Sequence, residues 1–99
     1  MRIEVDIPDY GPEGISLKWS PEALLAVMLL YDDFDIMGNK EGLQLLGSCF
    51  LRLAQDDVPS DYSLRLTEEQ GLQKGSEDLI IRKDDDPAKF LENSVSSSD

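Results

Sequence analysis

The chain has 99 residues, of which 21 are Asp or Glu, 9 are Lys or Arg and none is His, so its formal charge at pH 7 is −12. This length allows one small domain, and the negative charge argues against nucleic acids and anionic membrane surfaces as partners, because both attract clustered Lys and Arg. The absence of His and the single Cys exclude a Ser-His-Asp triad, a His-ligated metal site and an internal disulfide.

The N-terminal residues predict a β-hairpin. Residues 2–7 alternate between apolar and charged side chains, which is the period of a half-buried strand. Residues 8–14 contain two Pro and two Gly and are predicted to form a loop. Residues 15–19 alternate again, so the economical interpretation is a hairpin that spans residues 2–19.

The next segment is an apolar run whose pattern fits both a helix and a strand. Ser20 and Pro21 form a favoured helix start, which predicts a short helix over residues 21–30. A strand over residues 27–36 is the open alternative, because a run that is apolar on every side has no diagnostic periodicity. Residues 32–37, where acids alternate with apolar side chains, fit a short strand or an extended connector.

A long amphipathic helix is predicted over residues 40–55, with Asn39 as its N-cap. Gly42 and Gly47 inside this helix each cost about 1 kcal/mol relative to Ala, which suggests that a sheet or another helix lies close to it there. The predicted apolar stripe consists of Leu43, Leu45, Leu46, Cys49, Phe50, Leu53 and Ala54.

Two further strands are predicted, over residues 61–67 and 78–83. The predicted fold is α+β, with one domain over residues 1–83. It has a small, mostly antiparallel sheet of four or five strands, with one long and one short helix on one face. Residues 84–99 are acidic and Ser-rich and are expected to form a disordered tail.

No constellation of residues points to catalysis or to a cofactor. Residues 33–38 resemble the start of a calcium-binding loop, but Met37 and Gln44 occupy two of its ligand positions. Cys49 lies on the apolar stripe, as expected of a buried structural thiol. We therefore expect a chain that is not an enzyme and binds no metal or cofactor. With neither a signal peptide nor an apolar run of membrane-spanning length, it is expected to be cytoplasmic.

The acidic residues are the candidate binding groups. Residues 84–99 hold five acids and one base, and residues 1–83 hold sixteen acids and eight bases, so the two parts carry −4 and −8. Acids gather near the ends of predicted elements and would form a negative patch for a cationic partner if those ends meet. The candidate contacts are Asp32, Asp33, Asp35, Asp56, Asp57, Glu68 and Glu69, with Tyr10 as an aromatic anchor.

The start of the long helix also resembles a known family. The segment Gly38-Asn39-Lys40-Glu41-Gly42-Leu43, continuing through Leu46 to Leu53-Ala54, is similar to the immunity family numbered thirty-two of bacterial polymorphic-toxin systems. The resemblance covers residues 38–81, including the strand at 62–66 and the closing segment at 75–81. It implies a small cytoplasmic α+β protein that binds and neutralises a cognate toxin domain, often a nuclease. It carries over no catalytic residue.

These patterns support two main hypotheses. The first is an immunity-type protein that binds a basic, nuclease-like toxin domain and occludes its active surface through acidic contacts, without chemistry of its own. The alternative is a structural or assembly subunit that forms a homodimer through a sheet edge or through residues 24–31. A small hydrolase or metal-binding protein that uses the paired acids is the third hypothesis.

Overall fold

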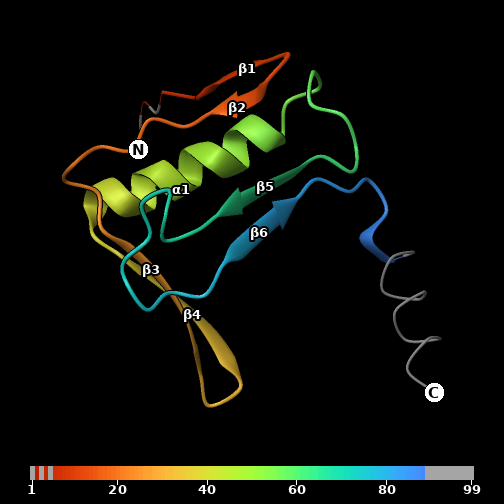
Figure 1. Ribbon diagram of the computed structural model, residues 1–99. Coiled ribbons are helices and arrows are strands. Elements are labelled where there is room, and N and C mark those ends of the chain that lie inside the picture. Colours follow the sequence, from red (N-terminus) through yellow and green to blue (C-terminus); the bar gives the residue numbers. More distant parts are fainter. Residues whose placement is uncertain (1, 3, 5, 89–99) are drawn as a thin grey trace, which may run out of the picture.

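The computed structural model describes residues 2, 4 and 6–88. One helix and three two-stranded antiparallel sheets, β1–β2, β3–β4 and β5–β6, form in this part of the chain (Figure 1). The α+β class is therefore confirmed, whereas a single sheet of four or five strands and a second, short helix are not found in the described residues. In chain order the elements are β1 (Asp9–Gly11), β2 (Gly14–Ser16), β3 (Leu25–Leu30), β4 (Asp33–Gly38), α1 (Lys40–Leu53), β5 (Ser63–Leu66) and β6 (Leu79–Arg82).

The helix predicted over residues 21–30 is wrong, and the alternative of a strand in this region is closer to the structure. The hydroxyl of Ser20 accepts a hydrogen bond from the Glu22 amide at 3.2 Å, so it closes a local turn instead of capping a helix. The apolar run then enters β3, which pairs with β4 along its whole length. Its burial alternates as expected of a strand: Leu25 and Val27 are buried, whereas Ala26 and Met28 between and beyond them are half-buried.

The N-terminal hairpin has different boundaries from those predicted. β1 lies within residues 8–14, the predicted loop, whereas β2 begins at the last residue of that loop and continues into the predicted second strand, where Ile15 pairs with Tyr10. The segment rich in Pro and Gly therefore supplies a tight turn and not a wide loop. Residues 2, 4 and 6–8 are not in a strand, and residues 3 and 5 of the predicted first strand lie outside the described part of the chain.

The core lies against one side of α1. Figure 1 shows α1 between the β1–β2 hairpin and the β5–β6 pair. The buried stripe of α1 runs through Leu46, Cys49 and Leu53, whereas Leu43 and Phe50 of the predicted stripe are about half exposed. The buried cluster consists of Leu25, Val27, Leu46, Cys49, Leu53, Val58, Leu64, Leu66 and Leu72.

Asn39 joins the start of α1 to the base of the β3–β4 hairpin. Its side-chain Oδ1 accepts hydrogen bonds from the amides of Gly42 at 2.8 Å and Leu24 at 2.9 Å. Its Nδ2 donates to the Glu22 carbonyl at 2.8 Å, and its backbone amide donates to the Leu24 carbonyl at 3.1 Å. The predicted N-cap is thus confirmed, and it also fixes the segment that leads into β3.

The last two strands lie within their predicted ranges, 61–67 and 78–83. Leu64 and Leu66 of β5 are buried and face the core, as the alternating pattern indicates. The described residues 84–88 contain no strand. The rest of the predicted tail, residues 89–99, lies outside the described part of the chain.

Candidate functional site

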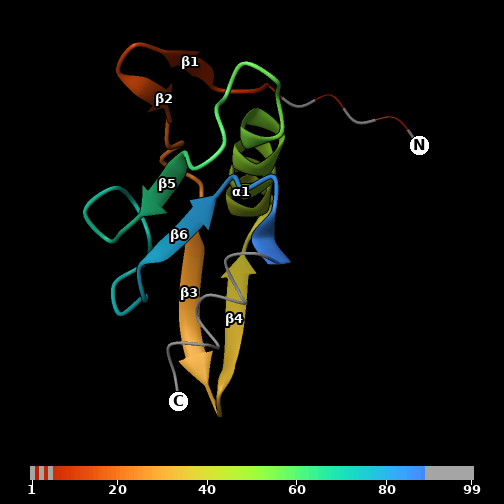
Figure 2. The same cartoon turned by 90° about the vertical axis from the view of Figure 1, so that its right-hand side faces the viewer.

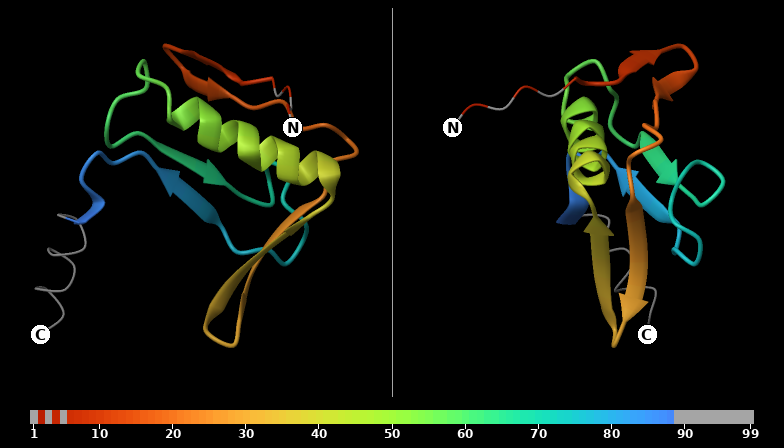
Figure 3. Two further views of the ribbon diagram at one scale, coloured as in Figure 1. Left: turned by 180° about the vertical axis from the view of Figure 1, so that it is seen from behind. Right: turned by 90° about the vertical axis from the view of Figure 1, so that its left-hand side faces the viewer.

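The β3–β4 hairpin projects away from α1 and from the other two sheets (Figures 1, 2 and 3). Its base is held by the loop between β5 and β6, since the amides of Gln73 and Glu77 donate to the carbonyls of Leu25 and Val27 at 2.9 and 2.7 Å. Within the described residues, no segment bonds to the outer edge of β3 beyond Val27, and no other strand pairs with β4. We call the projecting part, residues 28–36, the arm.

One face of the arm is apolar. Cross-strand partners share a face of a hairpin, and the register pairs Val27 with Ile36 and Leu29 with Phe34. Leu25 and Val27 are buried in the core on this face, but farther out Leu29 and Phe34 are 52% and 71% exposed. The apolar face of the core thus continues into solvent along the arm.

The other face and the tip of the arm carry the acids. Asp33 lies opposite Leu30 and Asp35 lies opposite Met28, so both carboxylates share a face. Asp32 lies in the two-residue turn that joins the strands. The arm therefore separates an apolar face from a mixed face that bears two carboxylates.

The turn holds Tyr31 in full contact with solvent. Tyr31 and Asp32 both have positive φ, 50° and 68°, as the type I′ turns that close two-residue hairpins require. Asn-Gly is the preferred sequence for such a turn, because other side chains are strained in the left-handed region. Tyr31 is 98% exposed, so no packing within the described chain offsets that strain.

Asp56, Asp57 and Tyr10 lie elsewhere. The segment after α1 is at the opposite end of the helix from the arm (Figures 1 and 2). There Asp57 forms an ion pair with Arg52, whose guanidinium lies 5.7 Å above the Tyr10 ring. Tyr10 in turn packs edge-to-face on Tyr62, with ring centroids 5.5 Å apart. Both Tyr10 and Asp57 are therefore engaged in contacts within the chain.

Glu68 and Glu69 lie in the loop between β5 and β6, where Glu68 accepts a hydrogen bond from the Gly75 amide. The same loop supports the base of the arm. The structure thus brings Asp32, Asp33 and Asp35 together with exposed apolar side chains and leaves the other predicted acids at separate places. The idea that the ends of the elements gather all acids on one side is not what the described chain shows.

The sequence patterns did not single out the exposed side chains Leu29, Tyr31 and Phe34 as contacts for a basic partner. The helix predicted over residues 21–30 gave no reason to expect Leu29 to be exposed, and only the homodimer alternative, through residues 24–31, treated Leu29 and Tyr31 as contacts. The sequence also gave no signal for the turn. Tyr31 and Asp32 occupy the two turn positions, where Asn-Gly is the sequence typical of a two-residue hairpin. An exposed aromatic in this position can be recognised only once the strand register is known.

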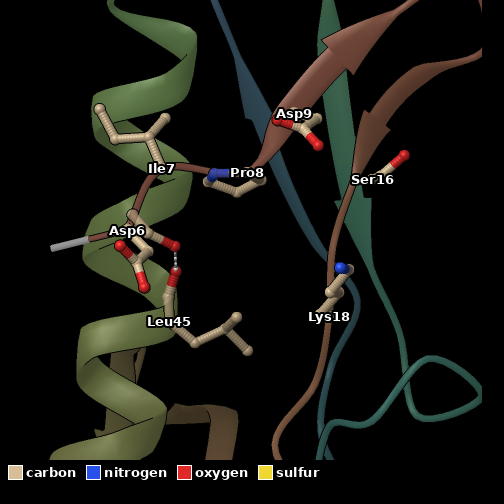
Figure 4. A pocket seen from close by; sticks show the side chains of 8 residues that line it. Asp6, Ile7, Pro8, Asp9, Ser16, Lys18 and Leu45 are labelled. Atoms are coloured by element: carbon tan, nitrogen blue, oxygen red, sulfur yellow. Dashed lines mark hydrogen bonds between the residues drawn. The ribbon is translucent and has the colours of Figure 1, made fainter.

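A second surface feature is a hollow of about 360 Å³ between the N-terminal segment, β2 and α1 (Figure 4). Asp6 and Ile7 lie beside α1 in Figure 4, and Ser16 and Lys18 lie across from them. The hydroxyl of Ser48 donates to the Leu45 carbonyl at 2.6 Å, so it is already engaged. The lining combines two acids, one Lys and two Ser hydroxyls in no arrangement typical of a catalytic site.

Cys49 is buried in the core as a free thiol, as expected. Burial raises the pKa of this thiol from 9.0 to about 11, and outweighs a backbone hydrogen bond that lowers it. Since the folded pKa lies above the unfolded one, the thiol favours the folded state fully below pH 9. This contribution is lost as pH rises from 9 through about 11, where the folded state also ionises.

Thiol labelling tests the burial of Cys49. At pH 8 we expect iodoacetamide to react with the native protein at least about 100-fold more slowly than with the urea-unfolded chain, because two pKa units reduce the thiolate fraction about 100-fold. Mass spectrometry of quenched samples measures both rates. Equal rates in the two states would show that Cys49 is accessible and contradict this account.

The described residues hold no group of three or more His, Cys, Asp or Glu side chains that could bind a metal ion. Among them, no helix has the length and apolar character needed to cross a membrane. Comparisons of the chain with protein-family models, curated proteins and solved structures find no match. The chemistry of the arm is therefore the basis on which a function can be argued.

Proposed function

We propose that this chain is a non-catalytic inhibitor of the immunity type, which binds a basic, nuclease-like toxin domain and covers its active surface. The observation that carries the proposal is the formal charge of −12, with three acids on a projecting hairpin. Asp32, Asp33 and Asp35 have no ion pair with the described residues, whereas Asp57 and Asp78 pair with Arg52 and Arg65. Their charge is available to a partner.

The carboxylates of Asp32, Asp33 and Asp35 suit a mechanism in which the chain covers the active surface of the toxin. A nuclease domain needs a positive surface to hold phosphates, and an acidic protein can occupy the same surface. Electrostatic steering between opposite charges raises the association rate and makes it sensitive to salt. No proton transfer or nucleophilic attack by this chain is required. The resemblance of residues 38–81 to an immunity family supports the same assignment.

Growth rescue tests the proposal. The probe is the protein encoded by the open reading frame immediately upstream of the gene for this chain, which the proposal expects to be the toxin, expressed with and without the chain. We expect the toxin alone to stop growth and co-expression to restore it. We also expect the purified proteins to form a complex whose affinity falls as salt rises. Failure of the wild-type chain both to rescue growth and to bind would contradict the proposal.

A homodimeric assembly subunit is the second candidate, because the outer edge of β4 pairs with no strand of the described residues and this edge, with the apolar face of the arm, suits strand pairing between two copies. Light scattering separates the two candidates. A mass near 11.1 kDa for the chain alone favours the inhibitor, and twice that mass favours the homodimer. Two chains of charge −12 repel each other, so a dimer that strengthens at high salt is expected if the second candidate holds.

A further inference from the structure

We propose that the arm, residues 28–36, is the element that enters the partner, and that its site there is an apolar cleft bordered by Lys and Arg. This inference rests on the proposed function and identifies the surface that carries it. The apolar face with Leu29 and Phe34 would pack inside the cleft. The acids of the turn and of the other face would meet the cationic border.

The exposure of the apolar face is the first argument. Tyr31, Phe34 and Leu29 are 98%, 71% and 52% exposed, and they are neighbours on one short hairpin. Single exposed apolar residues are ordinary on a protein surface, but a contiguous group on a projecting element marks an interaction site. Aromatic side chains in particular dominate the binding energy of protein interfaces.

The turn is the second argument. Tyr31 occupies a left-handed conformation that favours Asn or Gly, and its ring contacts solvent. A turn that served only to connect β3 and β4 would be more stable with Asn at this position. Departures from a local structural preference without a compensating contact are expected at functional sites. The tyrosine therefore fits a role in binding better than a role in the fold.

The negative charge of the arm indicates what kind of partner it binds. The sequence contains no Lys or Arg between Lys18 and Lys40, so Asp32, Asp33 and Asp35 give the arm an uncompensated negative charge. A second copy of this chain would bring the same three carboxylates to the contact, and like charges in an interface oppose association. A cationic protein surface offers the opposite sign. The arm therefore fits a basic partner and does not fit another arm.

Two aromatic variants test the apolar contact, with the wild-type chain and a catalytically inactive form of the upstream-encoded toxin domain as the binding pair. We expect Phe34→Ala to weaken the complex at least about 30-fold, as the loss of an interface hot spot does. We expect Tyr31→Asn to weaken it about 10-fold while leaving the melting temperature of the free chain equal or higher. The matched control is Phe50→Ala on α1, which is expected to change affinity less than about 2-fold.

A charge-matched pair of triple variants tests the acids. One replaces the three arm acids with Asn, and the other removes three exposed acids elsewhere, so both chains have a net charge of about −9. We expect the arm triple to lower the association rate about 10-fold and to flatten its salt dependence, and the control triple to change it about 2-fold at most. The arm triple is Asp32→Asn, Asp33→Asn and Asp35→Asn, and the control triple is Glu13→Gln, Glu22→Gln and Asp85→Asn.

The outcomes separate this inference from the proposed function. If the wild-type chain binds and rescues but the arm variants match it, the inhibitor stands and the arm as its contact surface is overturned. If Phe50→Ala weakens binding and Phe34→Ala does not, α1 is the contact surface and the inference is again overturned. If the wild-type chain neither binds nor rescues, the proposed function falls and this inference falls with it. Selective loss in the arm variants supports both.

Discussion

Replacing Gly42 with Ala is expected to destabilise the protein by about 2–3 kcal/mol and to lower its melting temperature by about 10–20 °C. An Ala Cβ at this position would overlap the carbonyl oxygen of Leu24 and lie 2.7 Å from its carbon, closer than real side chains approach. Because this neighbour is backbone, relief requires the start of α1 to move away from Leu24. That movement would weaken the hydrogen bond from the Asn39 amide to the Leu24 carbonyl.

Gly47→Ala is the matched control in the same helix. Among the described residues outside the backbone of α1 itself and its two chain neighbours, nothing lies within 4 Å of the position that its Cβ would occupy. The helix propensity of Ala should therefore act alone and stabilise the protein by about 0.5–1 kcal/mol. Thermal and urea unfolding of both variants measure the two effects. Equal shifts for Gly42→Ala and Gly47→Ala would mean that α1 does not contact Leu24 as described.

Replacing Asn39 with Ala is expected to cost about 2–3 kcal/mol, more than the loss of an ordinary N-cap, which costs about 1 kcal/mol. The side chain accepts from the amides of both Gly42 and Leu24 and donates to the Glu22 carbonyl. Its removal leaves these groups without their partner and frees the segment that leads into β3. Urea unfolding of the variant measures the loss.

Asn39→Asp provides the control, because the carboxylate retains both acceptor bonds and loses only the donor to Glu22. We expect it to cost less than about 1 kcal/mol, helped by the favourable interaction of a negative charge with the helix N-terminus. Hydrogen exchange should show faster exchange at the Leu24 amide in Asn39→Ala than in Asn39→Asp. If the two variants lose equal stability, the hydrogen bonds that Asn39 accepts from Gly42 and Leu24 do not stabilise the contact between α1 and the segment that leads into β3.

Residues 38–43 therefore have a structural explanation. Gly38 lies at the end of β4, Asn39 caps α1, and Gly42 allows the first turn of the helix to lie against Leu24. Gly42 needs its small size and Gly47 does not, which the sequence alone does not distinguish. The contact between the start of α1 and Leu24 orients the β3–β4 hairpin relative to α1 and so determines the position of the arm.

Local signals predicted some elements well and others poorly. Helix α1 with its N-cap at Asn39 and strand β5 follow from capping and side-chain periodicity, because each element has one buried and one exposed face, and β6 follows from a short apolar run. The prediction for residues 21–30 was wrong because Ser20 and Pro21 favour a helix locally, whereas pairing with β4 determines the structure of residues 25–30. That pairing depends on a two-residue turn at Tyr31 and Asp32 whose sequence gives no signal.

The candidate site could be predicted only in part. The acids at 32–35 were recognisable from composition, because three carboxylates in four residues stand out in any conformation. The exposure of Tyr31 and Phe34 depends on the projection of the hairpin beyond the core, which is a property of tertiary structure. For Tyr10, by contrast, the tertiary structure provides Arg52 and Tyr62 as contacts within the chain.

Hydrogen exchange of the chain, free and bound to the inactive toxin domain encoded upstream, tests the central claim most directly. The claim is that the arm is the surface that a basic partner covers. We predict that binding slows exchange most strongly in peptides that span residues 28–36 and leaves the segment around Asp56 and Asp57 unchanged. Unchanged exchange in the arm, with protection confined to α1 or to residues 56–57, would contradict the account.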